Sequence, residues 1–169
     1  MTPVFRPAER SDVPAIAALF ERSFVHTFAY LYRSEDLELF LAGSTVEAWQ
    51  AEFDDPLYAF FVAEAGSDLV GFVKLGPPAL PVERNGPAVE LRSIYLHPDW
   101  IGRGLSAPMM DWAIGEARRR GAEELYLTVY VDNMRARRLY KRYGFVEIGP
   151  YAFMVGNQAD EDIIMRLTL

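Results

Sequence analysis

The chain has 169 residues, of which 51% are hydrophobic and 24% charged, a composition typical of one globular domain and not of a disordered chain. It contains no cysteine, which excludes disulfide scaffolds, thiol nucleophiles and cysteine-ligated metals. Its two histidines, His26 and His97, are far apart in sequence, so we expect no metal site. The net charge of −7 argues against general nucleic-acid binding. No apolar run approaches the roughly 20 residues that span a bilayer, and the N-terminus has no signal-peptide core, so we expect a soluble, cytoplasmic protein.

Hydrophobic periodicity and turn residues divide the chain into alternating strands and helices. In chain order the expected elements are a strand at 2–6, a helix from Ser11 to Phe28, helices at 35–42 and 44–53, a hairpin of strands 57–65 and 69–75, a strand at 88–96, a helix from Leu105 to Gly121, a strand at 124–130, a helix from Ala136 to Gly144, and strands at 145–149 and 162–168.

Two local signals support this division. Ser11, followed by Asp12 and Pro14, is typical of an N-cap with an acid and a proline in the first turn. The segment 76–87 holds four prolines and two glycines and is expected to be a loop, too short to separate domains. The element order therefore predicts a single domain over residues 1–169, of α/β or α+β class, with a mixed sheet.

A glycine-bearing turn leads from the strand at 88–96 into the next helix. Gly102 and Gly104 let the backbone approach a ligand closely, and the free N–H groups of a helix N-terminus favour an anion. A turn without a ligand is equally compatible with the glycines alone. The same residues, with Ala107, fit a dinucleotide-binding pattern, but five residues separate them from the strand. The nearest acid after the next strand, Asp132, lies 30 residues beyond Gly102 instead of about 20, so that alternative is weak.

Two motifs resemble those of the GNAT superfamily, the acetyl-CoA-dependent N-acetyltransferases. The run Ile101-Gly102-Arg103-Gly104-Leu105-Ser106 is similar to its motif A, with Ile101 in place of Gln or Arg and Ser106 in place of Gly or Ala. The run from Asn133 through Ala136 and Tyr140 to Gly144-Phe145 is similar to a second family motif. The resemblance covers essentially the whole chain and implies one GNAT domain with a mixed, mostly antiparallel central sheet flanked by helices. The flanking runs Ser23-Phe24 with Thr27-Phe28, and Phe153–Gly156 with Asp162–Met165, narrow the resemblance to the PaiA-type spermine/spermidine acetyltransferases.

The resemblance implies a set of site residues. Tyr140 is expected to be the general acid near the thioester sulfur, and Glu90, at the position of the base glutamate of some relatives, is expected to be the general base. On period two, Glu90 would share a face with Arg92, Ile94 and Leu96. The residues expected to bind acetyl-CoA, mainly through the backbone, are Ile94, Tyr95, Leu96, Ile101, Gly102, Arg103, Gly104, Leu105, Ser106, Ala107, Asn133 and Tyr140. Each of the three side chains has a structural alternative: Glu90 as a solvent-facing partner of Arg92, Tyr140 as a core aromatic, and Asn133 as a helix cap.

The uneven distribution of charge along the chain indicates which ligands the protein could attract, including the amine that accepts the acetyl group. Residues 118–142 carry eight Lys or Arg and three acids, so this segment is +5 and the remainder is −12. The basic segment could face an anion or be a pair of solvated helix faces. Two acidic clusters, Glu35, Asp36 and Glu38 in one and Asp160, Glu161 and Asp162 in the other, could attract a polyamine by long-range electrostatics or serve only solubility.

We therefore expect acetyl transfer from acetyl-CoA to a small-molecule amine such as spermidine or spermine, by direct attack in a ternary complex and without a metal, nucleic acid or membrane. Homodimerisation is left open. The alternatives are a peptide, protein or antibiotic-like amine as acceptor, or a non-catalytic CoA-binding sensor. His97 is expected to be structural. His26 is expected either to contact the acceptor or to lie on the surface.

Overall fold

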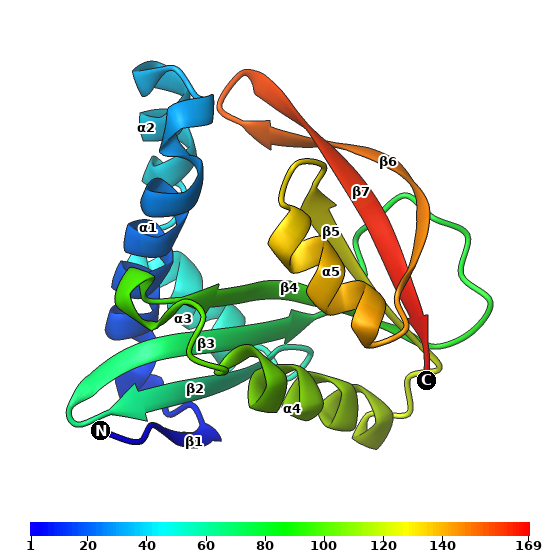
Figure 1. Ribbon diagram of the computed structural model, residues 1–169, viewed down its shortest axis with the longest axis horizontal. Helices are drawn as coiled ribbons and strands as arrows, with labels where there is room; N and C mark the ends of the chain where they lie inside the picture. The colour runs from blue at the N-terminus through cyan, green and yellow to red at the C-terminus, as the bar shows by residue number, and fades with distance from the viewer.

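A computed structural model describes residues 1–169 and shows a seven-stranded sheet with helices on both faces (Figure 1). The strand order is β1-β2-β3-β4-β5-β7-β6, and only the β4–β5 pair is parallel. The strands are β1 Val4–Pro7, β2 Ala59–Ala65, β3 Asp68–Gly76, β4 Ala88–Leu96, β5 Glu124–Tyr130, β6 Val146–Val155 and β7 Gln158–Thr168. The helices are α1 Val13–Phe28, α2 Ser34–Ala42, α3 Val46–Asp54, α4 Ser106–Arg119 and α5 Met134–Arg142, with short 3-10 turns at Arg10–Asp12, Ala29–Leu31 and Pro98–Trp100. The predicted mixed, mostly antiparallel sheet flanked by helices is confirmed.

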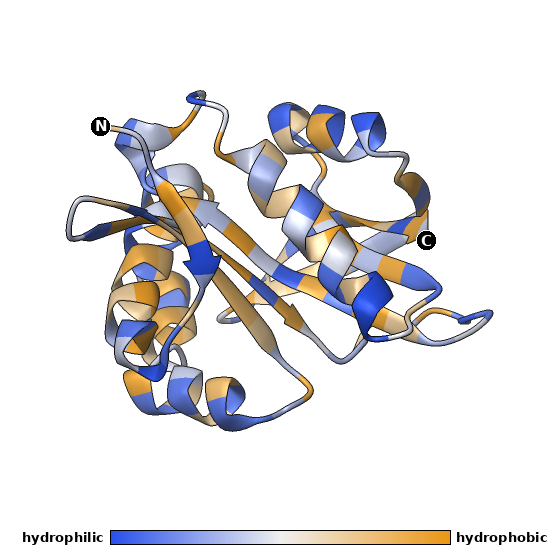
Figure 2. Cartoon of the chain, turned by 90° about the horizontal axis from the view of Figure 1, so that it is seen from below, coloured by the Kyte–Doolittle hydropathy of each residue, from blue (hydrophilic) through white to orange (hydrophobic).

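Each face of the sheet has its own hydrophobic core. Helices α1 to α3 cover one face, where Phe20, Trp49 and Phe72 are buried. Helices α4 and α5 cover the other, where Leu75 and Met109 are among the fully buried residues. Hydrophobic positions of the helices turn toward the sheet and hydrophilic ones away from it, as Figure 2 shows. This amphipathic pattern explains why the helices assemble against the sheet, and burial of their apolar stripes stabilises the arrangement.

The start of α1 differs from the prediction. Ser11 is exposed, and its side chain caps no helix. Instead, the backbone N–H of Glu9 donates to the Asp12 carboxylate at 2.7 Å, which closes a 3-10 turn before α1. The carboxylate of Asp12, one residue after Ser11, is a stronger hydrogen-bond acceptor than the Ser11 hydroxyl, and the Arg6 guanidinium also binds it at 2.7 Å. Pro14 lies in the first turn of α1, as expected.

The last two strands are much longer than the predicted 145–149 and 162–168. Strands β6 and β7 form a continuous hairpin whose turn is Gly156-Asn157, with Gly156 at a φ of +58°. Pro150 lies within β6, which is an edge strand of the sheet and therefore tolerates a residue without a backbone donor. The turn of this hairpin lies beside α2 (Figure 1), and the Asp36 carboxylate accepts from the Asn157 N–H at 2.8 Å.

None of the helices combines the length and apolar character that crossing a bilayer requires.

Candidate active site

The strands β4 and β5 part in the middle of the sheet. They pair only at Ala88–Glu90 and Glu124–Tyr126, and beyond this point β4 pairs with β3 alone and β5 with β7 alone. Figure 1 shows the two strands diverging toward the loop before α4 and the start of α5. A cavity of about 820 Å³ lies there, lined by Leu91–Leu96 of β4 and Leu127–Tyr130 of β5. The parting leaves strand-edge backbone groups of β4 free to pair with an extended ligand.

The loop that leads into α4 forms one end of the cavity. Gly102 and Gly104 both have positive φ values, +81° and +83°. The backbone N–H groups of Gly102, Gly104, Leu105, Ser106 and Ala107 donate to no backbone acceptor, and no side chain accepts from them. A Cβ atom at Gly104 would meet nothing within 4 Å. The loop is thus an open cradle of donors at a helix N-terminus, suited to an anion.

Not every predicted loop residue reaches the cavity. Ile101, Gly102, Gly104, Ser106 and Ala107 line it. Arg103 instead packs its guanidinium over the Trp100 ring at 5.1 Å, and Leu105 is buried in the core beside α4. These two residues can contribute only backbone groups to a ligand.

Helix α5 adds positive charge beside this cradle. Four of its side chains, Arg135, Arg138, Lys141 and Arg142, surround a smaller surface hollow. Arg135 comes within 3.2 Å of the position that a Gly102 Cβ would take. Only part of the basic segment lies here, because Arg119 and Arg120 bind Glu116 at the far end of α4. The interpretation of an anion-facing region therefore applies to α5 and not to the whole segment 118–142.

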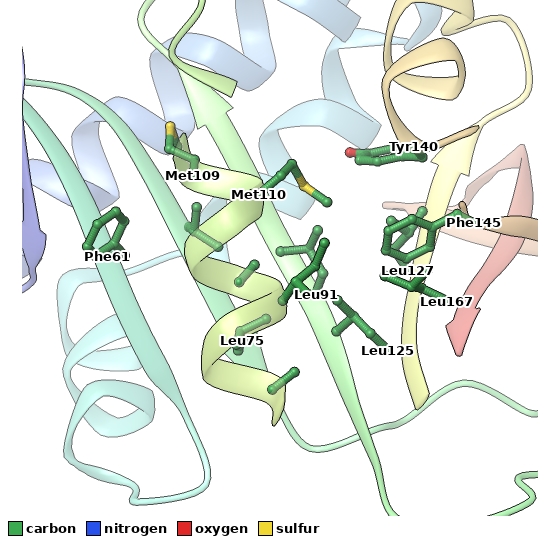
Figure 3. Close-up of a cluster of buried hydrophobic side chains, with 14 of the residues drawn as sticks. Phe61, Leu75, Leu91, Met109, Met110, Leu125, Leu127, Tyr140, Phe145 and Leu167 are labelled. Carbon is green, nitrogen blue, oxygen red and sulfur yellow. The ribbon is translucent and has the colours of Figure 1, made fainter. Parts of the chain in front are cut away.

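Asn133 begins α5, and its side chain accepts from the Ala136 N–H at 3.3 Å. It is therefore a helix cap, as in its structural alternative, and it also lines the cavity. About two helical turns after Asn133, Tyr140 is only 6% exposed and packs against Phe145 at 5.8 Å between ring centroids. Figure 3 shows its hydroxyl turned away from Phe145. The Tyr140 side chain lines the cavity, its hydroxyl has no hydrogen-bond partner, and burial raises its pKa well above the usual value.

The opposite part of the cavity is aromatic and acidic. Two carboxylates reach it from β7, those of Asp160 and Asp162, each 8% exposed. The Tyr32 hydroxyl, from the turn after α1, donates to Asp160. The aromatic side chains that line this part are Phe20, Phe24, Phe28, Tyr32, Phe40, Trp49, Tyr95, Tyr130 and Phe153.

The cations in this part are each paired. The Lys74 ammonium binds Glu52 at 2.6 Å and stacks on Trp49 at 4.2 Å. Arg92 binds Glu90 and donates to the Pro77 carbonyl at 2.6 Å. Asp160 and Asp162, in contrast, have no cationic partner.

The structure does not bring Glu90 to the cavity. Glu90 is 5% exposed, its carboxylate binds Arg92, and it is not among the residues that line the cavity. Burial raises its pKa, while Arg92 and Lys74 act in the opposite direction. The predicted shared face is wrong for Ile94 and Leu96, whereas Arg92 does lie beside Glu90 and binds it. Arg92 is an extra residue in β4, since Lys74 pairs with Ser93 and Leu75 with Leu91. This bulge moves the residues that follow to the other face.

Beyond the bulge, Ile94 and Leu96 pack on the α4 side, whereas Tyr95 packs on the α1 side against Phe20 and Phe72. All three line the cavity.

Other predicted candidates lie outside the cavity. His26 is exposed. His97 is structural, because its Nδ1 accepts from the Asp99 N–H at 3.2 Å at the start of a 3-10 turn. Glu35 and Glu38 lie on the exposed side of α2, and Asp36 is buried against Arg33 and the β6–β7 turn. Of the two acidic clusters, only Asp160 and Asp162 reach the cavity. No group of three or more His, Asp or Glu side chains is arranged to hold a metal ion.

The parted parallel pair, the donor cradle and the cationic helix beside it have the shape and charge that suit an extended, anionic ligand between two strands. The model of the Acetyltransferase (GNAT) family matches residues 15–145, and the chain belongs to this family. It is an acetyl-CoA-dependent N-acetyltransferase.

Relatives and solved structures agree with this assignment. An uncharacterised N-acetyltransferase of Mycobacterium tuberculosis is 28% identical over 92% of this chain and 96% of its own. Among solved structures, the PaiA N-acetyltransferase from Thermoplasma acidophilum in complex with coenzyme A is similar over all of both chains, with a TM-score of 0.78 at 21% identity. The yncA structure from Salmonella typhimurium, solved with its cofactor acetyl-CoA, has a TM-score of 0.71 at 26% identity over 100% of this chain and 95% of its own.

Proposed function

We propose that this enzyme acetylates a primary amine of a polyamine, such as spermidine or spermine, by direct attack in a ternary complex. The observation that carries the proposal is the pair of buried carboxylates, Asp160 and Asp162, in an aromatic cavity without a cation to neutralise them. Two uncompensated carboxylates favour a cationic ligand, and aromatic faces add cation–π attraction to an ammonium group. The resemblance of the flanking segments to PaiA-type enzymes points to the same acceptor class.

The residues of the α4 end fit acetyl-CoA. The pyrophosphate of acetyl-CoA can accept from the five backbone N–H groups of this loop that have no acceptor within the protein. The Arg and Lys side chains of α5 beside the loop can bind the negatively charged phosphates. We assign this role to Ile101–Ala107, with Arg135 and Arg142 from α5. The stretch Ile94–Leu96 is assigned to the pantetheine, which would extend the sheet as an added strand: the backbone groups of Ile94 and the Leu96 N–H face away from β3, whereas Tyr95 pairs with Phe72 of β3. Asn133, which caps the start of α5, is also assigned to binding of the pantetheine.

Tyr140 is assigned as the general acid. Acetyl-CoA supplies an activated acetyl group as a thioester, and the departing thiolate needs a proton. The Tyr140 hydroxyl suits this task because it is protonated at neutral pH, has no competing partner and lines the cavity. The chain has no cysteine that could carry the acetyl group, and direct transfer to the amine needs none.

The test is turnover of acetyl-CoA with a panel of acceptors: spermidine, spermine, a peptide with a free N-terminus and an aminoglycoside. We expect acetylation of the polyamines, identified by mass spectrometry of the product, and a KM that rises from low to physiological salt. Acetylation of the peptide or the aminoglycoside alone would assign the enzyme to another acceptor class. Binding of acetyl-CoA without turnover of any amine would favour a sensor.

A further inference from the structure

The parting of β4 and β5 joins the two faces of the sheet. Tyr140 belongs to the core on the α4–α5 face, whereas Asp162 points to the opposite face, since its neighbours Ile163 and Met165 face the α4–α5 core. Both side chains nevertheless line the same cavity. Burial raises the pKa of Tyr95, and Tyr95 lies close enough to both groups for their ionised forms to raise it further. A ligand that crosses the gap therefore meets Tyr140 from one face and Asp162 from the other.

Asp162 is held in a specific environment on β7. It lies opposite Tyr130 of β5 and Tyr151 of β6 in the sheet register. Burial raises the pKa of its carboxyl to about 7, the charge of Asp160 acts in the same direction, and a hydrogen bond from Thr128 opposes them. The titratable groups that face it from the surrounding elements are Asp160, Tyr32, Tyr95, Tyr130, Tyr140 and Tyr151, and no cation is among the groups that shift it.

We propose that Asp162 is the general base of the reaction, opposite the acid Tyr140. This proposal rests on the proposed function, attack by an amine within a ternary complex. The position fits the chemistry because the acceptor nitrogen must lie between the base and the thioester, and Asp162 is on the aromatic, acceptor side of the gap. The unpartnered hydroxyl of Tyr140, itself more than nine-tenths buried, marks the other side of the same gap. Glu90 has no such access, because it is paired with Arg92 and does not line the cavity.

The proton balance is complete with these two groups. The acceptor arrives as an ammonium ion, since the reference pKa of an alkylamine is near 10.4. Asp162 takes one proton from it, and the freed nitrogen attacks the thioester carbonyl carbon. The carbon–sulfur bond then breaks, and the sulfur takes the Tyr140 proton. The new amide nitrogen gives up a second proton, which restores the Tyr140 hydroxyl. Asp162 passes its proton to water, so each turnover forms one amide and one thiol and releases one proton.

The experiment is the pH dependence of kcat and kcat/KM in the wild type and in Asp162→Asn, with whichever amine the enzyme accepts best. In the wild type we expect both parameters to rise through a limb near pH 7 as the base ionises. Asp162→Asn should lose this limb and lower kcat at neutral pH roughly 10²-fold. The defect should shrink near the pKa of the amine, where more acceptor is already neutral.

Two variants on the same strand complete the test. Glu161→Gln changes an exposed residue next in sequence and should keep both the rate and the limb. Asp160→Asn removes the neighbouring charge and should move the limb to lower pH, because that charge raises the pKa of Asp162. An unmoved limb in Asp160→Asn, or a wild-type kcat in Asp162→Asn, would overturn the proposal. A rise in KM with unchanged kcat would also overturn it, since Asp162 would then only bind the cation.

The base assignment and the acceptor assignment can fail separately. If polyamines are inert but another amine is acetylated, the polyamine proposal falls and the pH profile is measured with that amine. Stabilisation by acetyl-CoA in thermal unfolding verifies that each variant is folded and binds the cosubstrate. If Asp162→Asn does not fold, the shift of the limb in Asp160→Asn alone decides the question.

Discussion

The hydroxyl of Ser23 donates to the carbonyl of Leu96 at 2.7 Å. Ser23 is 2% exposed in the middle of α1, and Leu96 is the last residue of β4, where the strand leaves the sheet for the loop before α4. The bond thus fixes one wall of the gap to the helix that covers the acceptor side. It also occupies the Leu96 carbonyl, so that a ligand in the gap meets the remaining backbone groups of β4.

Ser23→Ala should therefore destabilise the fold by about 1–2 kcal/mol, because the part-buried Leu96 carbonyl loses its donor. Urea unfolding measures this change as a lower midpoint at unchanged slope. Ser11→Ala, at an exposed position without a capping bond, is the matched control and should unfold like the wild type. Equal midpoints for the two variants would mean that water replaces the Ser23 hydroxyl at no cost.

Gly104 and Gly121 offer a matched pair for the cosubstrate site. Both have a positive φ, +83° and +79°, and a Cβ at either would meet nothing within 4 Å. Gly104 lines the cavity at the start of α4, whereas Gly121 follows its far end. Alanine at either position should cost similar stability through backbone strain. Only Gly104→Ala should also weaken acetyl-CoA binding, by about tenfold or more, as calorimetry would show. Equal affinity in both variants would place the cosubstrate elsewhere.

The contact between α2 and the β6–β7 turn has a defined pH dependence. The Asn157 N–H bond, followed by the charge of Arg33, lowers the pKa of Asp36 below its usual value. A carboxyl whose pKa is lower in the folded state stabilises the fold above its unfolded pKa of about 3.9, and this contribution is lost as the pH falls through the folded value. Asp36→Asn should thus lower the melting temperature at pH 7, and the difference from the wild type should shrink as the pH falls through the folded pKa of Asp36. Glu35→Gln, exposed one position earlier, should show neither effect.

Local patterns predicted most of the fold because they act within single elements. The strands at 88–96 and 124–130 have the predicted bounds, and the helices follow the apolar spacing of residues such as Phe20 and Met109. The β6–β7 hairpin was underestimated because its length depends on pairing with β5 and on the edge position of Pro150, both of which are tertiary facts. Glu9 and Asp12 took over the role expected of Ser11 because Arg6, from the neighbouring strand, holds the Asp12 carboxylate.

For the candidate site, too, the sequence predicted some residues and missed others. Loop glycines and the second motif located the donor cradle and Tyr140, whose side chain reaches the cavity. Strand periodicity failed for Glu90, since one extra residue, Arg92, reverses the faces beyond it. From the sequence, Asp162 is assigned to an acidic cluster and to a flanking run, with no catalytic role. Only the assembled sheet shows that this residue is buried and lines the same cavity as Tyr140.

Tyr140→Phe separates catalysis from packing. The phenyl ring keeps the contact with Phe145, and the lost hydroxyl has no partner in the protein. The free energy of unfolding should therefore stay close to that of the wild type, and the acetyl-CoA affinity should stay within a few-fold of it. If the hydroxyl protonates the departing thiolate, kcat should fall roughly 10²-fold or more. Steady-state kinetics with saturating acetyl-CoA and calorimetric binding measure the two effects independently. Tyr143→Phe is the control on the same helix, because the Tyr143 hydroxyl binds the Ala107 carbonyl at 3.1 Å and Asp111 at 3.0 Å. That variant should lose stability and keep most of its kcat. A Tyr140→Phe enzyme that unfolds more easily but turns over at the wild-type rate would mark Tyr140 as a core residue and assign the proton to another donor.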